Sequence, residues 1–356
     1  MYKFFSEKTE QLIRAFINKT VGAQLSSKDF PGGLPVSISR DLLPRLSGIN
    51  ECTHLEYALS FKADGERMYL GFICLEGEFL SFLMDRRGYL TKIDLPLYAI
   101  LYEGTLLDVE LINKTTFLIF DCACIHGNQC MKSFYPDRLE LARHLLQTCL
   151  NDPEHLSTHE IAVEHTSIMY PSTLPDIILN TGKWKMKVKT LFYASTIRDV
   201  PLAWIYPDDG FIWTLTTAPF HVFHDHSLNV LKWKPVNRIS IDFRVTKTLC
   251  PDLLFLPSIE KISNLTDCDG KYRQVETAMT HRLETDYKGT PIWFAGIHAT
   301  GLVNGIYECS WDHRTHTWMI LQERKDKRFP NSIYTVLKTI DNLDEAITRT
   351  DLHKLN

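Results

Sequence analysis

Apolar and polar residues alternate along most of the chain, and helical spacing is confined to a few segments. Alternation predicts strands from Tyr57 to His126, across 158–235, and in short runs from Ile239 to Gln322. Apolar residues recur at a helical interval in 6–19, in 136–149 and in 332–354. The pattern predicts an α+β protein with an antiparallel-sheet domain, a small β-rich domain and a helical tail.

Capping residues and prolines mark the borders of these parts. Ser6 suits the N-cap of the first helix, and Pro136 suits the first position of the second. Pro235 ends a run of strands and predicts a domain boundary. We therefore expect one domain over 1–237, a second over 238–328, and a helical segment over 329–356 that packs back on the first domain.

Composition narrows the class of protein. The 356 residues are 44% hydrophobic and 23% charged, so the chain can bury a sizeable core. With a net charge of −4, any contact with nucleic acid requires a local basic patch. The nine cysteines form no C-x-x-C pair, which predicts reduced thiols and no zinc site of the usual spacing. No run approaches 18 apolar residues and no signal peptide is evident, so we expect an intracellular protein without a membrane span, cytoplasmic (a viral factory or virion included) or nuclear.

The most informative stretch is Lys62-Ala-Asp-Gly-Glu-Arg67, which lies between two apolar runs. The runs, Tyr57–Phe61 and Met68–Ile73, are typical of strands joined by a tight turn at Gly65. A lysine at a strand end that is desolvated and surrounded by cations has a lowered pKa and becomes a nucleophile. The alternative is an ordinary hairpin with Lys62 in solvent.

Five further clusters carry groups that a phosphate-transfer site needs: cations for phosphate oxygens and carboxylates for a hard metal ion. Each alone is also compatible with a solvated strand face or a surface ion pair. In chain order they are Asp85-Arg86-Arg87, Asp108-Val109-Glu110, Asp208-Asp209-Gly210, Lys232-Trp233-Lys234-Pro235 and Arg324-Lys325-Asp326-Lys327.

In order and spacing these motifs resemble those of the covalent nucleotidyltransferases, which include mRNA capping guanylyltransferases and ATP-dependent polynucleotide ligases. The chain is most similar to capping guanylyltransferases, particularly the compact enzymes of large DNA viruses, and the resemblance runs from about Phe30 to the C-terminus. Three elements favour capping: Met84-Asp-Arg86, Leu231-Lys-Trp-Lys-Pro235, and Arg324-Lys-Asp-Lys327 followed by Pro330-Asn331.

The resemblance implies a role for individual residues. Lys62 would attack the α-phosphate of GTP and carry GMP to the 5′-diphosphate end of RNA, with Mg²⁺ or Mn²⁺ held by Asp209. Lys232 and Lys234 would contact the α-phosphate, and Phe120 would stack on guanine. The remaining expected contacts are Arg67, Arg86 and Glu110 near the ribose, Asp242 near the phosphates, and Arg324 with Lys327 on the β- and γ-phosphates when the second domain, an OB-fold, closes.

The chain departs from the family pattern at two positions, and two further sequence patterns have no role in the resemblance. Val109 stands where the family commonly has glycine, which leaves the role of Asp108 open, and His226 stands where a relative carries arginine. Four lysines alternate over 183–189, which predicts either a basic strip that guides RNA or an amphipathic strand with a solvated face. His221, His224 and His226 invite a metal site, although such histidines are more often surface or core residues.

Two alternatives to guanylyl transfer stay open: a ligase that uses ATP through the same lysine, and an inactive relative that acts as an RNA-binding subunit of a capping complex. The chain carries no H-C-x-x-G-x-x-R phosphatase signature and no G-x-G-x-G methyltransferase loop. We therefore expect the RNA triphosphatase and the cap methyltransferase to be separate proteins or other parts of a longer polypeptide.

Overall fold

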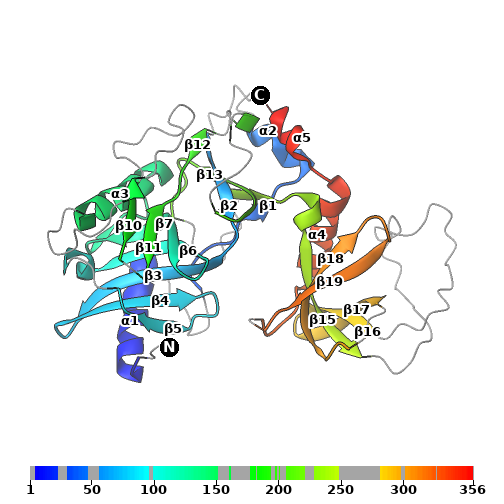
Figure 1. Cartoon of the computed structure of the whole chain (residues 1–356), viewed down its shortest axis with the longest axis horizontal. Helices are drawn as coiled ribbons and strands as arrows, with labels where there is room; N and C mark the ends of the chain where they lie inside the picture. Colours follow the sequence, from blue (N-terminus) through cyan, green and yellow to red (C-terminus); the bar gives the residue numbers. More distant parts are fainter. Residues whose placement is uncertain are drawn as a thin grey trace. The chain divides into compact units, whose positions relative to one another are not determined.

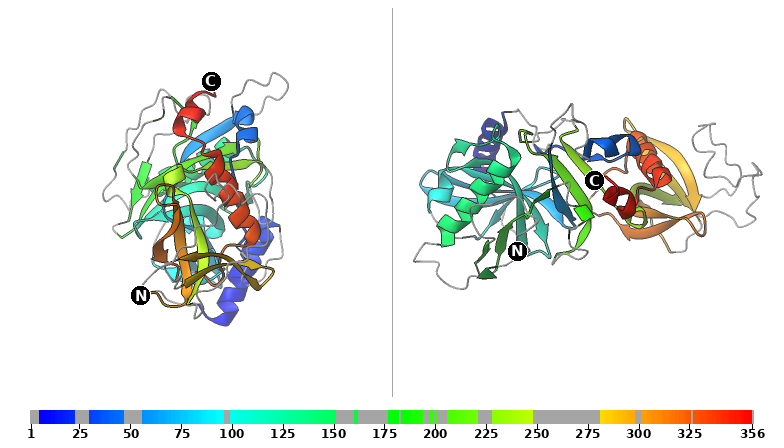
Figure 2. Two further views of the ribbon diagram at one scale, coloured as in Figure 1. Left: turned by 90° about the vertical axis from the view of Figure 1, so that its right-hand side faces the viewer. Right: turned by 90° about the horizontal axis from the view of Figure 1, so that it is seen from above.

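The computed structural model describes residues 5–22, 30–46, 56–95, 99–150, 160–161, 177–181, 183–193, 197–198, 200, 206–220, 228–247, 281–297, 301–325 and 327–355. The chain forms two compact units. Unit 1 comprises Met1–Lys234 and Arg349–Asn356, and unit 2 comprises Pro235–Thr348. The elements of each unit are labelled in Figure 1, and Figure 2 gives two further views.

A nine-stranded sheet is the larger sheet of unit 1. Its order is β5-β4-β3-β6-β7-β11-β10-β9, with β8 paired to β7, and all pairs are antiparallel except β7 with β11. The strands are β3 (Glu66–Leu75), β4 (Glu78–Asp85), β5 (Leu90–Ile93), β6 (Thr105–Ile112), β7 (Thr116–Ile125), β8 (Asn128–Gln129), β9 (Glu160–Ile161), β10 (Ile177–Asn180) and β11 (Lys185–Val188).

Helices α1 (Glu7–Val21) and α3 (Tyr135–Leu150) pack on this sheet in two separate apolar cores. Strand β3 contributes alternate residues to them, with Leu70 in the core of α3 and Tyr69 in the core of α1. The period of two along a strand therefore buries both faces of the sheet. The predicted cap is confirmed, since the Ser6 hydroxyl accepts a hydrogen bond from the Thr9 amide at 3.2 Å. A short helix, η2, covers Ala99–Glu103.

A second sheet of unit 1 has five strands in the order β1-β14-β13-β2-β12. These are β1 (Val36–Ser37), β2 (Tyr57–Ala63), β12 (Phe192–Tyr193), β13 (Asp208–Leu215) and β14 (Val230–Trp233), with η1 (Arg40–Leu42) and α2 (Leu43–Leu46) after β1. Strand β2 pairs with β12 and β13, whereas β3 pairs with β4 and β6. The hairpin alternative is therefore wrong: the turn at Gly65 passes the chain from one sheet to the other.

Unit 2 contains an antiparallel five-stranded sheet in the order β17-β16-β15-β18-β19. The strands are β15 (Ser240–Lys247), β16 (His281–Tyr287), β17 (Thr290–Ile297), β18 (Gly305–Asp312) and β19 (Thr317–Glu323), preceded by η5 (Val236–Arg238). Helix α4 (Ile333–Glu345) buries Val336, Ile340 and Leu343 in the core of this sheet.

The C-terminal helical segment divides between the units, which differs from the expectation that all of it packs on the first domain. The apolar stripe of α4 matches the core of unit 2, while α5 (Arg349–His353) belongs to unit 1. There Arg349 donates to the Val200 carbonyl at 3.2 Å and stacks on the Phe211 ring at 5.1 Å. The predicted α+β class with a C-terminal β-domain is confirmed. In the described ranges no helix is both long and apolar enough to cross a membrane.

Candidate active site

Lys62 lies near the end of β2, directly beside the first residues of β13. Its ammonium nitrogen is 2.7 Å from Oδ1 of Asp209, whose Oδ2 is 2.5 Å from Nζ of Lys234. The side chain of Lys62 is 23% exposed, so it is neither free in solvent nor sealed in the core. One carboxylate thus joins three of the residues that the sequence singles out, from β2, β13 and the end of β14.

Gly210 allows β13 and β14 to approach at this point. Its φ is +137°, and a Cβ atom there would lie 2.0 Å from the Trp233 carbonyl oxygen. The pairing of β13 with β2 also shifts register between Asp208 and Phe211. Only glycine tolerates both the conformation and the contact, so the Asp-Gly pair sets the position of the Asp209 carboxylate.

Cations gather around Lys62. The pKa of Lys232 is lowered to about 8, first by burial and then by the positive charges of Lys62, Lys234 and Arg86, with Asp209 acting in the opposite direction. Burial raises the pKa of Asp209, but Lys62 and Lys234 outweigh it, so the net pKa is lowered and the carboxylate stays ionised at neutral pH. The structure therefore brings the predicted residues Lys62, Lys232, Lys234 and Asp209 together and places Arg86 within electrostatic reach.

Arg67, on β3, is held in place by the protein itself. Its guanidinium group donates from Nε and Nη2 to the two oxygens of Asp108 at 3.0 and 2.7 Å, and from Nη1 to the Gly33 carbonyl at 2.6 Å. The same group stacks on the rings of Phe30 and Phe120, each at 5.3 Å. The role of Asp108, left open by the sequence, is thus to hold Arg67, and a contact of Arg67 with ribose stays a prediction.

Phe120 occupies a β-bulge. In the β6–β7 ladder Asp108 faces Asp121 and Val109 faces Ile119, so Phe120 has no partner across the strand. It is half-buried, whereas its neighbours in β7 are buried. A bulge re-aims one side chain relative to the rest of a strand. Here the ring is presented to the cations of Arg67, at 5.3 Å, and Lys189, at 5.6 Å.

Lys189 belongs to this site and was not singled out from the sequence. It is 6% exposed, and its pKa is lowered to about 8, because burial and the charge of Lys62 together outweigh the attraction of Glu110. Burial in turn raises the pKa of Glu110, although Lys62 and Lys189 oppose this. Glu110 thus lies among the cations, and its expected contact with ribose stays a prediction. The only advance signal for Lys189 was its place in the lysine-rich run.

That run is neither of the surfaces that the sequence predicts. Lys187 is fully buried and Lys189 nearly so, while Lys183 is exposed. Strand β11 lies inside the sheet between β7 and β10, and the burial of Lys187 and Lys189 shows that the run is not a continuous solvated face. The three histidines at 221, 224 and 226 lie outside the described residues.

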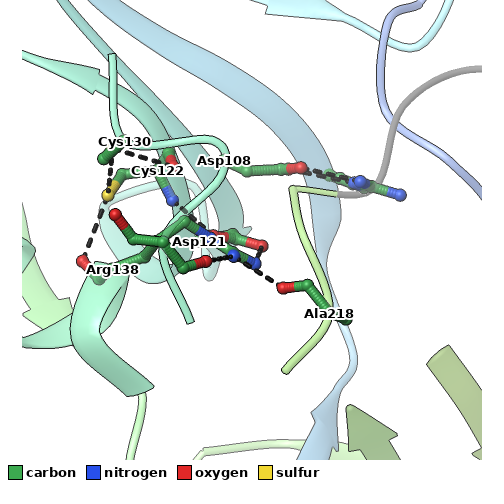
Figure 3. Close-up of polar contacts among 8 residues, drawn as sticks. Asp108, Asp121, Cys122, Cys130, Arg138 and Ala218 are labelled. Atoms are coloured by element: carbon green, nitrogen blue, oxygen red, sulfur yellow. Dashed lines mark hydrogen bonds and ion pairs between the residues drawn. The ribbon is translucent and has the colours of Figure 1, made fainter. Parts of the chain in front are cut away.

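A second buried ion pair lies beside the bulge (Figure 3). Arg138 of α3 donates to both oxygens of Asp121 at 2.6 and 2.9 Å, and to the carbonyls of Ser133 and Ala218 at 2.6 and 2.8 Å. The side chain of Arg138 is 1% exposed. Next to it the thiols of Cys122 and Cys130 are 3.4 Å apart. The six cysteines in the described part of the chain are all free thiols.

Unit 2 carries a separate cluster. Asp242 of β15 is 5% exposed and accepts Arg324 at 3.0 Å on Oδ1 and Lys327 at 2.6 Å on Oδ2. Glu308 lies 3.7 Å from the same Arg324 nitrogen. The three predicted residues of this unit are thus assembled around one buried carboxylate.

Comparison with known proteins gives the family. The sequence model for the mRNA capping enzyme catalytic domain matches residues 4–236, and that for the C-terminal domain matches residues 239–353. The chain belongs to the mRNA capping enzyme family. It is therefore a nucleotidyltransferase of the guanylyltransferase class, and this favours capping over the ligase alternative. No relative among those compared below tests the expected likeness to viral enzymes.

Relatives in this family align along most of the chain. The chain is 25% identical to the mRNA-capping enzyme subunit alpha of Schizosaccharomyces pombe, over 97% of this chain and 83% of that protein. It is 22% identical to the subunit alpha of Saccharomyces cerevisiae, over 97% and 82%. It is 23% identical to the mRNA-capping enzyme of Caenorhabditis elegans, over 92% of this chain and 49% of that protein.

The family uses a nucleotide and a divalent metal ion. The carboxylates of this site fit a metal ion that binds together with the substrate. Among the described residues no group of three His, Cys, Asp or Glu side chains is placed to hold a metal. The buried Oδ1 of Asp209 contacts only one ammonium group among the described residues, that of Lys62 at 2.7 Å, and a carboxylate oxygen has lone pairs for a second partner. Mg²⁺ typically binds through one or two carboxylates plus substrate phosphates, which requires no larger acidic cluster.

Proposed function

We propose that this chain transfers GMP from GTP to the 5′-diphosphate end of RNA through a covalent bond to Lys62. The observation that carries the proposal is the position of the Lys62 ammonium group, 2.7 Å from Asp209 and among the charges of Lys232 and Lys234. The Asp209 carboxylate fixes the amine, and the neighbouring cations would neutralise the phosphate group that the amine attacks.

The reaction has two steps. In the first, the neutral amine of Lys62 attacks the α-phosphorus of GTP, the bond to the β-phosphate oxygen breaks, and pyrophosphate leaves. In the second, a terminal phosphate oxygen of the RNA attacks the same phosphorus, the P–N bond breaks, and Lys62 leaves as an amine that regains a proton. Both transition states gather negative charge on phosphate oxygens, which Lys232 and Lys234 are positioned to neutralise.

Asp209 has two roles in this scheme. It holds the Lys62 side chain in register, and it is the residue that would bind the divalent ion. A divalent ion bound there would supply positive charge to the phosphate oxygens of the substrate.

The nucleoside is proposed to bind on the β6–β7 side of the site. Phe120 stacks on guanine, and Arg86 and Glu110 contact the ribose, with Arg67 fixed beneath the Phe120 ring. A flat aromatic ring supported by a guanidinium group is a suitable platform for a base. In unit 2 we assign Arg324 and Lys327 to the β- and γ-phosphates and Asp242 to holding both cations ready.

The test is a denaturing gel after incubation with divalent metal and α-labelled GTP or ATP, beside Lys62→Ala. Label from GTP that disappears in the variant, and that pyrophosphate or diphosphate-ended RNA releases, is the expected result. Lys62→Arg controls for charge, because it keeps the ion pair with Asp209 but cannot act as a nucleophile at neutral pH. Label from ATP alone would replace guanylyl transfer with the ligase reaction, and no label would leave an RNA-binding subunit.

A further inference from the structure

Two aspartates face each other directly beside the Phe120 bulge, on β6 and β7. Like charges at opposed positions of a sheet destabilise it unless each is compensated. Here each aspartate has its own arginine: Asp108 binds Arg67 through two bonds, and Asp121 binds Arg138 through two. The ladder loses register at this pair and skips Phe120. The bulge is therefore bounded by two carboxylate–guanidinium pairs.

The Asp121–Arg138 pair ties the bulge to α3 and to the segment that contains Ala218. Asp121 Oδ1 accepts the amide of Cys122 at 2.8 Å, so the carboxylate fixes the backbone of the strand immediately after Phe120. Arg138 reaches that carboxylate from the first turn of α3 and also binds two backbone carbonyls, at Ser133 and Ala218 (Figure 3). Its Nε, Nη1 and Nη2 atoms all donate to protein acceptors, and the side chain is 1% exposed.

We propose that Asp121 and Arg138 are positioning residues that fix the β7 bulge and thereby present the Phe120 ring to the guanine base. Neither side chain touches the reacting atoms, and their effect reaches GTP through Phe120. The inference rests on the proposed function, because it takes the base to bind at Phe120. It predicts that these residues set the affinity for GTP and leave the chemistry at Lys62 unchanged.

The experiment is a double-mutant cycle on single-turnover enzyme–GMP formation, with the GTP concentration giving half-maximal rate and the maximal rate measured separately. Loss of a stacking contact should raise the half-maximal GTP concentration about tenfold in Phe120→Ala. Asp121→Asn should raise it about fivefold with little change in maximal rate. Because both act on one contact, the double variant should stay near tenfold, not the roughly fiftyfold expected of independent effects.

A control separates positioning from loss of stability. Leu146→Ala removes a buried side chain of α3 that is 1% exposed and belongs to the apolar core. It should lower Tm but leave the half-maximal GTP concentration unchanged. Arg138→Lys, which keeps the charge but not the two-pronged geometry, repeats the cycle if Asp121→Asn does not fold.

The outcomes distinguish this inference from the proposed function. Independent, multiplicative effects in the double variant, or a Phe120→Ala variant with unaltered GTP dependence, would overturn the positioning role while enzyme–GMP still forms. An effect of Asp121→Asn on maximal rate alone would also overturn it. If the wild-type protein forms no enzyme–GMP at all, the proposed function fails and the inference fails with it.

Discussion

Replacing Lys189 by methionine should stabilise the protein without nucleotide and weaken it as an enzyme. Lys189 is buried, and its pKa falls from the ordinary value of 10.5 to about 8. That difference corresponds to about 3 kcal/mol by which the folded state disfavours the charged amine, as an order of magnitude. Methionine has a similar length and no charge, so it fills the site without this cost.

The sign of the pH dependence follows from the direction of the shift. Between about pH 8 and pH 10.5 an unfolded chain keeps the proton on this lysine and the folded protein does not. The unfolded state therefore binds more protons in that window, and the free energy of unfolding rises with pH. Lys189→Met should be more stable than wild type by about 3 kcal/mol at pH 7, and the advantage should vanish by about pH 10.5.

Calorimetry at several pH values measures the difference. For a unit of this size 1 kcal/mol corresponds to roughly 2–4 °C in Tm, so the unit 1 transition should rise by about 6–12 °C at pH 7. Leu146→Ala, which lowers the same transition, identifies it. Glu110 is the group that most strongly attracts the Lys189 charge and so opposes the lowering of the Lys189 pKa. A variant no more stable than wild type at pH 7, or an advantage that does not depend on pH, would refute the reasoning.

Three further changes test other parts of the molecule. Gly210→Ala should destabilise the folded protein by at least about 2 kcal/mol, because the new Cβ atom would lie 2.0 Å from the Trp233 carbonyl oxygen. Gly22→Ala is the control: its Cβ atom would have no atom within 4 Å, so it should cost only the strain of the positive φ. Equal Tm values for the two variants would contradict this. Asp209→Asn should slow enzyme–GMP formation about 10²- to 10³-fold and raise the metal concentration required, and an unchanged metal dependence would exclude it as a ligand. Asp242→Asn, which leaves two cations without their shared carboxylate, should impair the first step with GTP more than transfer from preformed enzyme–GMP to RNA; equal effects on both steps would argue against a role at the leaving phosphates.

Short-range sequence signals predicted many of the helices and strands. Strand β7 (Thr116–Ile125) lies within the stretch from Tyr57 to His126 that alternation predicts as strands, and α1 begins directly after the predicted cap at Ser6. The motif residues around Lys62 and Lys232 were found through the family resemblance, whereas their proximity depends on the pairing of β13 with both β2 and β14.

Features that depend on pairing between distant strands could not be predicted. The segments flanking Gly65 have the pattern of a hairpin, yet β2 and β3 enter different sheets, and only their partners in β13 and β6 decide this. Likewise alternation in 183–189 predicts one polar face in solvent, but β11 lies inside the sheet between β7 and β10, and Lys187 is fully buried there. The same holds for the division of the C-terminal helices between the units. The apolar stripe of α4 predicts that one face is buried, but it does not identify which unit's core buries that face.

Lys189, which the sequence analysis did not single out, shares one electrostatic setting with the cations that it did. Lys62, Lys189, Lys232 and Lys234, with Arg67 and Arg86, gather around the carboxylates of Asp108, Glu110 and Asp209 in the described part of unit 1. Burial lowers the pKa values of Lys189 and Lys232, and the neighbouring cations add to this, so the charged forms of both lysines oppose folding. A triphosphate supplies the missing negative charge. Binding of GTP should therefore both raise stability and return protons to these lysines, so the charge imbalance that weakens the empty site is what makes it selective for a polyphosphate.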